Sequence, residues 1–82
     1  MTMKTLILDS QWQPLTNGSN KLQLQILSGE VLYTESASLP GTDAACFVLH
    51  AGMGLLDIGP EASYVRASFG TAILTVLDRA GA

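Results

Sequence analysis

The segment Thr71–Leu77 (TAILTVL) constrains the fold most, because nearly all of its residues are apolar. Its short length and β-branched side chains favour a strand over a helix. Successive side chains of a strand point to opposite faces. A strand that is apolar on both faces must be covered on both sides, by the core of its own domain and by a second layer or a second subunit.

The preceding segment 63–68 (SYVRAS) also alternates, and Phe69-Gly70 separates it from the last strand. We expect these two segments to form a hairpin, with Gly70 in the positive φ that a tight turn needs. Alternation gives the first strand two faces. The core face holds Val65 and Ala67, and the opposite face holds Tyr64, Arg66 and Ser68.

Five further segments have strand patterns, each bounded by residues typical of turns. The clearest is 21–27 (KLQLQIL), in which leucine and isoleucine alternate with polar residues. The others are 5–9, 30–36, 44–50 and 55–58, whereas 10–20 and 37–43 are expected to be loops. This spacing predicts an all-β fold, a small antiparallel β-sandwich or barrel of about six to eight short strands.

A chain of 82 residues is long enough for one domain. We therefore expect a single β domain over residues 1–82, with flexible ends at about 1–4 and 78–82. The residues predicted to form the core are Leu24, Ile26, Val65, Ala67, Leu74 and Val76.

The composition is apolar for so small a domain. Hydrophobic residues make up 48% of the chain and charged residues 13%, against about 25% charged in an average soluble domain. Because a domain of this size buries only roughly 60% of its unfolded surface, we expect partners to cover part of the rest. A homo-oligomer is the simplest case. The predicted interface residues are Tyr64, Arg66, Ile73, Thr75 and Leu77.

Charge and targeting patterns narrow the classes of partner. The net charge is −3, and the four Lys and Arg residues are scattered, so no basic patch predicts nucleic-acid binding. The apolar run near the N-terminus is too short for a signal peptide, and no segment approaches membrane-spanning length. The single cysteine indicates a protein made and kept in a reducing cytoplasm.

The chemistry-bearing residues form no recognisable site. On a strand, Cys46 and His50 would be roughly 13 Å apart, too far to share a metal ion or to act as a nucleophile and its base. We expect Cys46 to be a buried, unmodified and functionally silent residue, and His50 to end a strand. No carboxylate pair or phosphate-binding loop is evident, so we expect no catalytic residue, metal or cofactor, and no enzyme.

Two residues have two interpretations each. Trp12 either caps one end of the core, with its indole N–H bonded to backbone, or contacts a partner. Arg66 either pairs with a carboxylate across the sheet or lies at a subunit or partner interface, where Arg and Tyr are enriched.

The order of several short motifs resembles a known group of proteins. The residues concerned are Trp12, Leu24-Gln25, Val31-Leu32-Tyr33, Pro40 and above all Tyr64–Ala72 (YVRASFGTA). They resemble the small all-β proteins of tailed-bacteriophage structural gene clusters, which include capsid decoration, head-fibre and tail-associated proteins. The resemblance implies a non-enzymatic structural virion protein, made in the bacterial host cytoplasm, that binds phage capsid or tail proteins.

Within that group, two roles stay open. The first is an oligomer seated on other virion subunits, and a trimer ranks above a dimer because capsid lattices offer three-fold sites. The second is a virion-displayed receptor- or glycan-binding module, which exposed aromatic residues on one surface would mark. The aromatic residues are few and mostly at core-like positions, which favours the first role: Trp12, Tyr33, Phe47, Tyr64 and Phe69.

Overall fold

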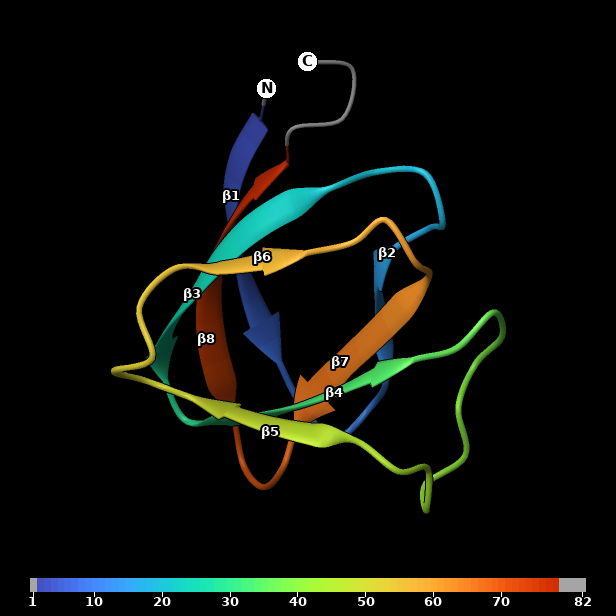
Figure 1. Cartoon of the computed structure of the whole chain (residues 1–82). Coiled ribbons are helices and arrows are strands. Elements are labelled where there is room, and N and C mark those ends of the chain that lie inside the picture. The colour runs from blue at the N-terminus through green and yellow to red at the C-terminus, as the bar shows by residue number, and fades with distance from the viewer. Residues whose placement is uncertain (1, 79–82) are drawn as a thin grey trace.

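The computed structural model describes residues 2–78, which form eight β-strands in two antiparallel sheets (Figure 1). Sheet A has the order β1-β8-β3-β6, and sheet B has the order β2-β7-β4-β5. The strands of sheet A are β1 (Thr2–Leu8), β8 (Ala72–Asp78), β3 (Leu22–Ser28) and β6 (Leu56–Ile58). The strands of sheet B are β2 (Gln13–Thr16), β7 (Ser63–Ala67), β4 (Glu30–Glu35) and β5 (Phe47–His50).

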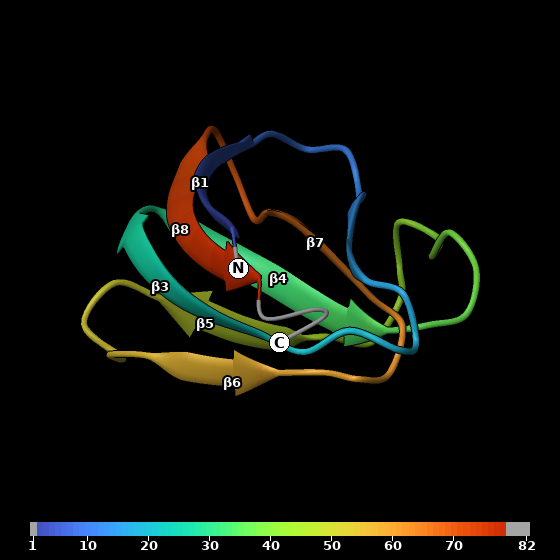
Figure 2. The same cartoon turned by 90° about the horizontal axis from the view of Figure 1, so that it is seen from above.

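The two sheets face each other, and sheet A curls around sheet B from β1 to β6 (Figure 2). The predicted small antiparallel β-sandwich is therefore confirmed. In the described part of the chain, no helix is long and apolar enough to cross a membrane.

The core lies between the sheets and is built from the alternate residues of each strand. All six predicted core residues are buried, so that prediction is confirmed. The buried hydrophobic residues are Leu8, Leu22, Leu24, Ile26, Val31, Tyr33, Leu49, Val65, Ala67, Ala72, Leu74 and Val76.

β7 and β8 do not form the predicted hairpin. Gly70 has the expected positive φ of 59°. However, β8 pairs with β1 and β3 in sheet A, and β7 pairs with β2 and β4 in sheet B. Each strand already has a neighbour on both sides, so neither has a free edge for the other. The turn instead carries the chain from one sheet to the other.

Two strand boundaries also differ from expectation. β2 lies within residues 10–20, which were expected to be a loop. That expectation rested on Pro14, which has no backbone N–H to donate to a neighbouring strand. β2 is an edge strand, and proline is tolerated there. Residues 2–4 were expected to be a flexible end but belong to β1, where their partners are residues 76–78 of β8. The rest of the expected C-terminal flexible end, 79–82, lies outside the described residues.

Gly29 allows the chain to pass from β3 in sheet A to β4 in sheet B. Its φ is +82°, and a Cβ atom at this position would lie 2.7 Å from the carbonyl oxygen of Thr71 and 2.8 Å from Cα of Ala72. Only glycine combines this conformation with so close an approach to a second backbone. The crossing from β3 to β4 is therefore packed directly against the start of β8.

Candidate interaction surfaces

The outer face of sheet A, here called the sheet A face, carries mostly uncharged side chains. Three rows of neighbouring residues cross it, and the central row is Thr5, Thr75 and Gln25. One flanking row joins Ile7, Ile73 and Ser28, and the other joins Met3, Leu77, Gln23 and Asp57. These side chains alternate with the core residues of the same strands, so they point away from sheet B.

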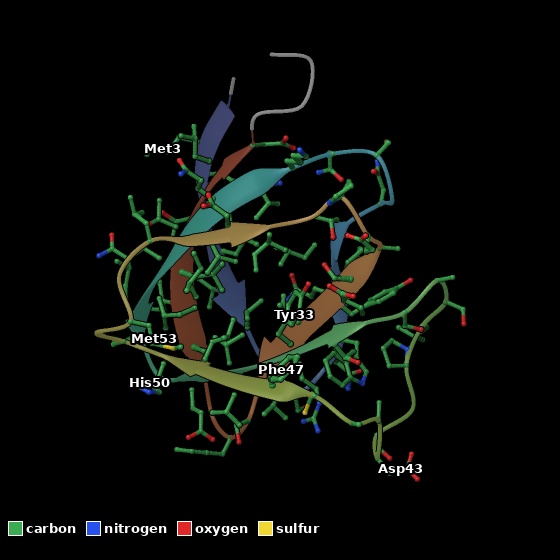
Figure 3. The ribbon with its side chains drawn as sticks, viewed as in Figure 1. Met3, Tyr33, Asp43, Phe47, His50 and Met53 are labelled. Atoms are coloured by element: carbon green, nitrogen blue, oxygen red, sulfur yellow. The ribbon has the colours of Figure 1, made fainter. Side chains whose placement is uncertain are left out.

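Several apolar side chains on this face are open to solvent. Met3 is 68% exposed, Ile7 67% and Leu55 69%, while Ile73 and Leu77 are half-buried. Figure 3 shows Met3 near the free end of β1. Among the described residues in these rows, Asp57 is the only charged one, and it accepts a hydrogen bond of 3.0 Å from Gln23 Nε2. Depletion of charge with exposed Met, Ile and Leu is the composition of an interface centre.

A hollow of about 280 Å³ indents the sheet A face between β8, β3 and the residue before β6. Two exposed apolar side chains, Met3 and Leu55, lie at its border. Its lining residues are Met3, Gln23, Leu24, Gln25, Leu55, Thr75 and Leu77.

The five predicted interface residues do not lie on one surface. Ile73, Thr75 and Leu77 lie together on the sheet A face. Tyr64 and Arg66 lie on β7, on the outer face of sheet B, because the alternate residues of that strand are buried. The sequence pattern could not reveal this division, since it was the expected hairpin that brought the two sets together.

Arg66 is half-buried against the Trp12 ring. Its guanidinium carbon lies 5.0 Å from the ring centroid, within the range of a cation–π interaction. The Nη atoms donate long hydrogen bonds to the carbonyl oxygens of Ala67 (3.4 Å) and Thr42 (3.5 Å). Nε is buried without a hydrogen-bond partner, and no described carboxylate pairs with the guanidinium. The interface interpretation of Arg66 stays a prediction.

Trp12 makes the predicted hydrogen bond to backbone but does not cap the core. Its Nε1–H donates to the carbonyl oxygen of Gly41 at 3.1 Å, as expected for an indole bonded to backbone. The ring is half-buried and lies beside Arg66 rather than among the core residues.

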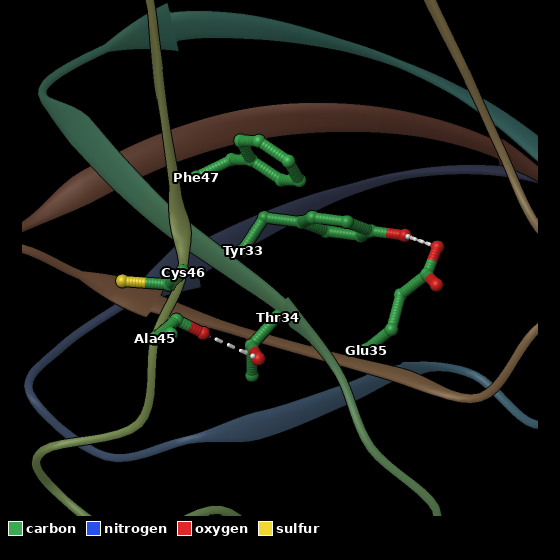
Figure 4. Close-up of a pocket in the computed structure, with 6 residues that line it drawn as sticks. All are labelled: Tyr33, Thr34, Glu35, Ala45, Cys46 and Phe47. Carbon is green, nitrogen blue, oxygen red and sulfur yellow. Dashed lines mark hydrogen bonds between the residues drawn. The ribbon is translucent and has the colours of Figure 1, made fainter.

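A second hollow, here called the Tyr33 hollow, lies at the end of β4 and the start of β5. Its volume is about 320 Å³, and Figure 4 shows the Phe47 and Tyr33 rings next to each other within it. The Tyr33 hydroxyl donates a hydrogen bond of 2.9 Å to Glu35 Oε2. The lining residues are Tyr33, Thr34, Glu35, Ala45, Cys46 and Phe47.

The pKa of Tyr33 is raised from its ordinary value of 10.0 to about 12, first by burial of the ring and then by the hydrogen bond to Glu35. The neutral phenol is therefore favoured in the folded state. Well below pH 10 the Tyr33 phenol is neutral in both the folded and the unfolded state, so it adds no pH dependence to the free energy of unfolding. Between pH 10 and about 12 the unfolded phenol ionises first, so the free energy of unfolding falls as pH rises.

We therefore expect a late alkaline titration of Tyr33. In a Tyr64→Phe variant, Tyr33 is the only tyrosine. The tyrosinate absorbance of the folded variant should have a midpoint near pH 12. A midpoint near 10 with the fold intact, checked by circular dichroism, would show that the ring is not buried as described.

Cys46 is exposed, so the expectation that it is buried is wrong. β5 begins one residue later, at Phe47, and the irregular segment before it leaves the thiol on the border of the Tyr33 hollow.

His50 ends β5 as predicted. Its backbone N–H donates to Met53 Sδ, with 3.2 Å between nitrogen and sulfur, and Figure 3 shows the two residues side by side. Within residues 2–78 no group of His, Cys, Asp and Glu is arranged to hold a metal ion.

Replacing Cys46 with serine is expected to leave the fold and the oligomeric state unchanged, because the thiol makes no hydrogen bond and lies outside the core. Thermal melting and sedimentation with and without a chelator provide the measurement. A change of assembly on adding the chelator would reveal a metal site that the described residues do not indicate.

Sequence reasoning missed several exposed apolar residues. Phe47 is 73% exposed and Phe69 71%, although the aromatic residues were expected to lie mostly at core-like positions. Phe47 lies on the same face of β5 as the buried Leu49. However, β5 is an edge strand, and its first residue extends past the core. For Met3 and Ile7 the sequence held no usable alternation, because Leu6, Ile7 and Leu8 are all apolar and Met3 lies outside the strand expected at 5–9.

No family model matches the chain, and neither does any curated protein or solved structure. The similarity of Tyr64–Ala72 to small phage proteins therefore stays a prediction.

Proposed function

We propose that the protein is a non-enzymatic structural component of a tailed-bacteriophage virion, which self-associates and binds capsid or tail subunits. The observation that carries the proposal is the sheet A face, where the described side chains of the three rows are apolar or uncharged except for Asp57. The assignment to the virion is supported by the motif resemblance centred on residues 64–72.

A second copy of the chain is the partner that best fits the sheet A face. Each copy carries a net charge of −3, and an uncharged contact surface keeps like charges away from the contact between two copies. A closed cyclic arrangement also removes the exposed patch without building fibres. A trimer is the form we expect, since a three-fold ring fits the local symmetry of capsid lattices. Tyr64 and Arg66, on the opposite sheet, would then be free to contact other virion subunits.

The test of this function has two parts. Sedimentation velocity of the purified chain at micromolar concentration should give an oligomer whose mass is insensitive to salt, because the contact contains little charge. Particles assembled from the genome that encodes the chain should contain it in a fixed ratio to the major capsid or tail subunit. A salt-independent monomer would refute the self-association, and absence from purified particles would refute the virion role.

A receptor- or glycan-binding module is the alternative. The exposure of Phe47 and Phe69 favours it, since open aromatic rings stack on sugars. A stable monomer that fails to bind particles lacking it, yet binds host cells, would support this alternative.

A further inference from the structure

The Tyr33 hollow combines an open aromatic ring with a carboxylate. The Phe47 side chain is 73% exposed, and Figure 4 shows it on the same side of β5 as the Tyr33 ring. Glu35 lies at the far end of that ring, where it accepts the hydrogen bond from the Tyr33 hydroxyl. The hollow is thus apolar along one wall and polar at one end.

The polar side chains of the hollow offer acceptors and almost no donors. The Tyr33 O–H is used by Glu35, and the Thr34 O–H donates to the carbonyl oxygen of Ala45 at 2.8 Å. The Ser63 hydroxyl also acts on the Tyr33 oxygen, which is buried, so the accessible sites that remain are lone pairs on the exposed Glu35 carboxylate. A ligand that satisfies this site must bring the donors itself.

The charge around the hollow is negative and lacks a cation. Both Glu35 and Glu61, which lies in the loop before β7, act electrostatically on the Tyr33 hydroxyl. No lysine or arginine within the described range forms an ion pair with either carboxylate, and Arg66 is engaged with Trp12. The face of the Phe47 ring adds a further region of negative potential, which attracts cations.

We propose that the Tyr33 hollow binds the cationic end of a lysine or arginine side chain presented by a partner protein. Glu35 accepts its N–H groups, and Phe47 packs against its charged head and methylene stem. A partner protein is the expected source, because one solvent-exposed ion pair and one ring contact bind weakly by themselves and further contacts of a partner would strengthen the binding. This site is distinct from the sheet A face and does not depend on the proposed function.

The test is a nuclear magnetic resonance titration of the intact chain with the peptide acetyl-Gly-Arg-Gly-amide, repeated with lysine in place of arginine. The backbone amides of residues 33–35 and 45–47 should shift in a saturable way. The same peptide with citrulline, which is isosteric but neutral, should bind at least about threefold more weakly. Raising the salt concentration should weaken arginine binding and leave citrulline binding unchanged.

Matched variants locate the contact. Glu35→Gln and Phe47→Ala should each weaken arginine binding by at least about threefold. Glu30→Gln makes the same charge change at the other end of β4, and Phe69→Ala removes another exposed ring, 71% exposed, so neither should alter binding. Equal binding of arginine and citrulline peptides, or shifts that persist in Glu35→Gln, would overturn the proposal. Because all of these side chains except Glu30 are exposed, the variants should fold, and their amide spectra verify it.

Discussion

Replacing Leu74 with alanine is expected to lower the free energy of unfolding by about 2–5 kcal/mol. Leu74 is 0% exposed at the centre of β8, with Leu6 and Ile26 as its cross-strand neighbours on the core side. Truncation removes apolar contacts on both sides and leaves a cavity, since central strands cannot move inward freely. Domains of this kind are stabilised by only about 5–15 kcal/mol, so the loss is a large fraction of the total.

Chemical denaturation of the variant and of the wild type provides the measurement. The matched control is Leu39→Ala, because Leu39 lies in the loop between β4 and β5 and is 69% exposed. That variant should change stability by less than about 0.5 kcal/mol. Equal stability of the Leu74 and Leu39 variants would contradict the placement of β8 in the core.

Placing a charge at Thr75 is expected to dissociate the oligomer that we propose. Thr75 lies at the centre of the sheet A face, between Thr5 and Gln25. In Thr75→Glu, an unpaired carboxylate from each copy would be buried at the contact, which costs several kcal/mol. The apparent dissociation constant should therefore rise by more than about 100-fold. Sedimentation across a concentration series measures this change.

Two further variants identify the cause of the dissociation. Thr75→Lys should also dissociate the oligomer, although it lowers the net negative charge, because desolvation penalises either sign. Ser38→Glu makes the same charge change as Thr75→Glu in the exposed loop between β4 and β5 and should leave the oligomer intact. If Thr75→Glu remains associated and folded, the sheet A face is not the contact.

The parts of the fold that the sequence predicted are those with strong alternation. β3 and β7 alternate cleanly because each is buried on one face, so their core residues followed directly from the pattern. The pairing of the strands did not follow, because alternation identifies faces but not neighbours. β7 and β8 illustrate this: they are adjacent in the chain, yet they belong to different sheets.

The candidate surfaces were predicted only in part. Ile73, Thr75 and Leu77 were identified because an apolar outer face on a central strand needs a cover. The exposed positions of Phe47 and Cys46 were not, since burial near an edge strand depends on where the strand ends relative to the core. Such a boundary arises from tertiary packing and leaves no periodic signal in the chain.

The chain crosses repeatedly between the two sheets, and this affects how the protein folds and unfolds. Every connection except that between β4 and β5 passes from one sheet to the other, and the crossing at Gly29 is wedged against Thr71 and Ala72. We therefore expect the two sheets to form together and to unfold together. We expect slow, all-or-none folding, with amide hydrogens in both sheets exchanging at the same global rate. We expect a protein built in this way to bear a pulling force as one unit, with both sheets unfolding together.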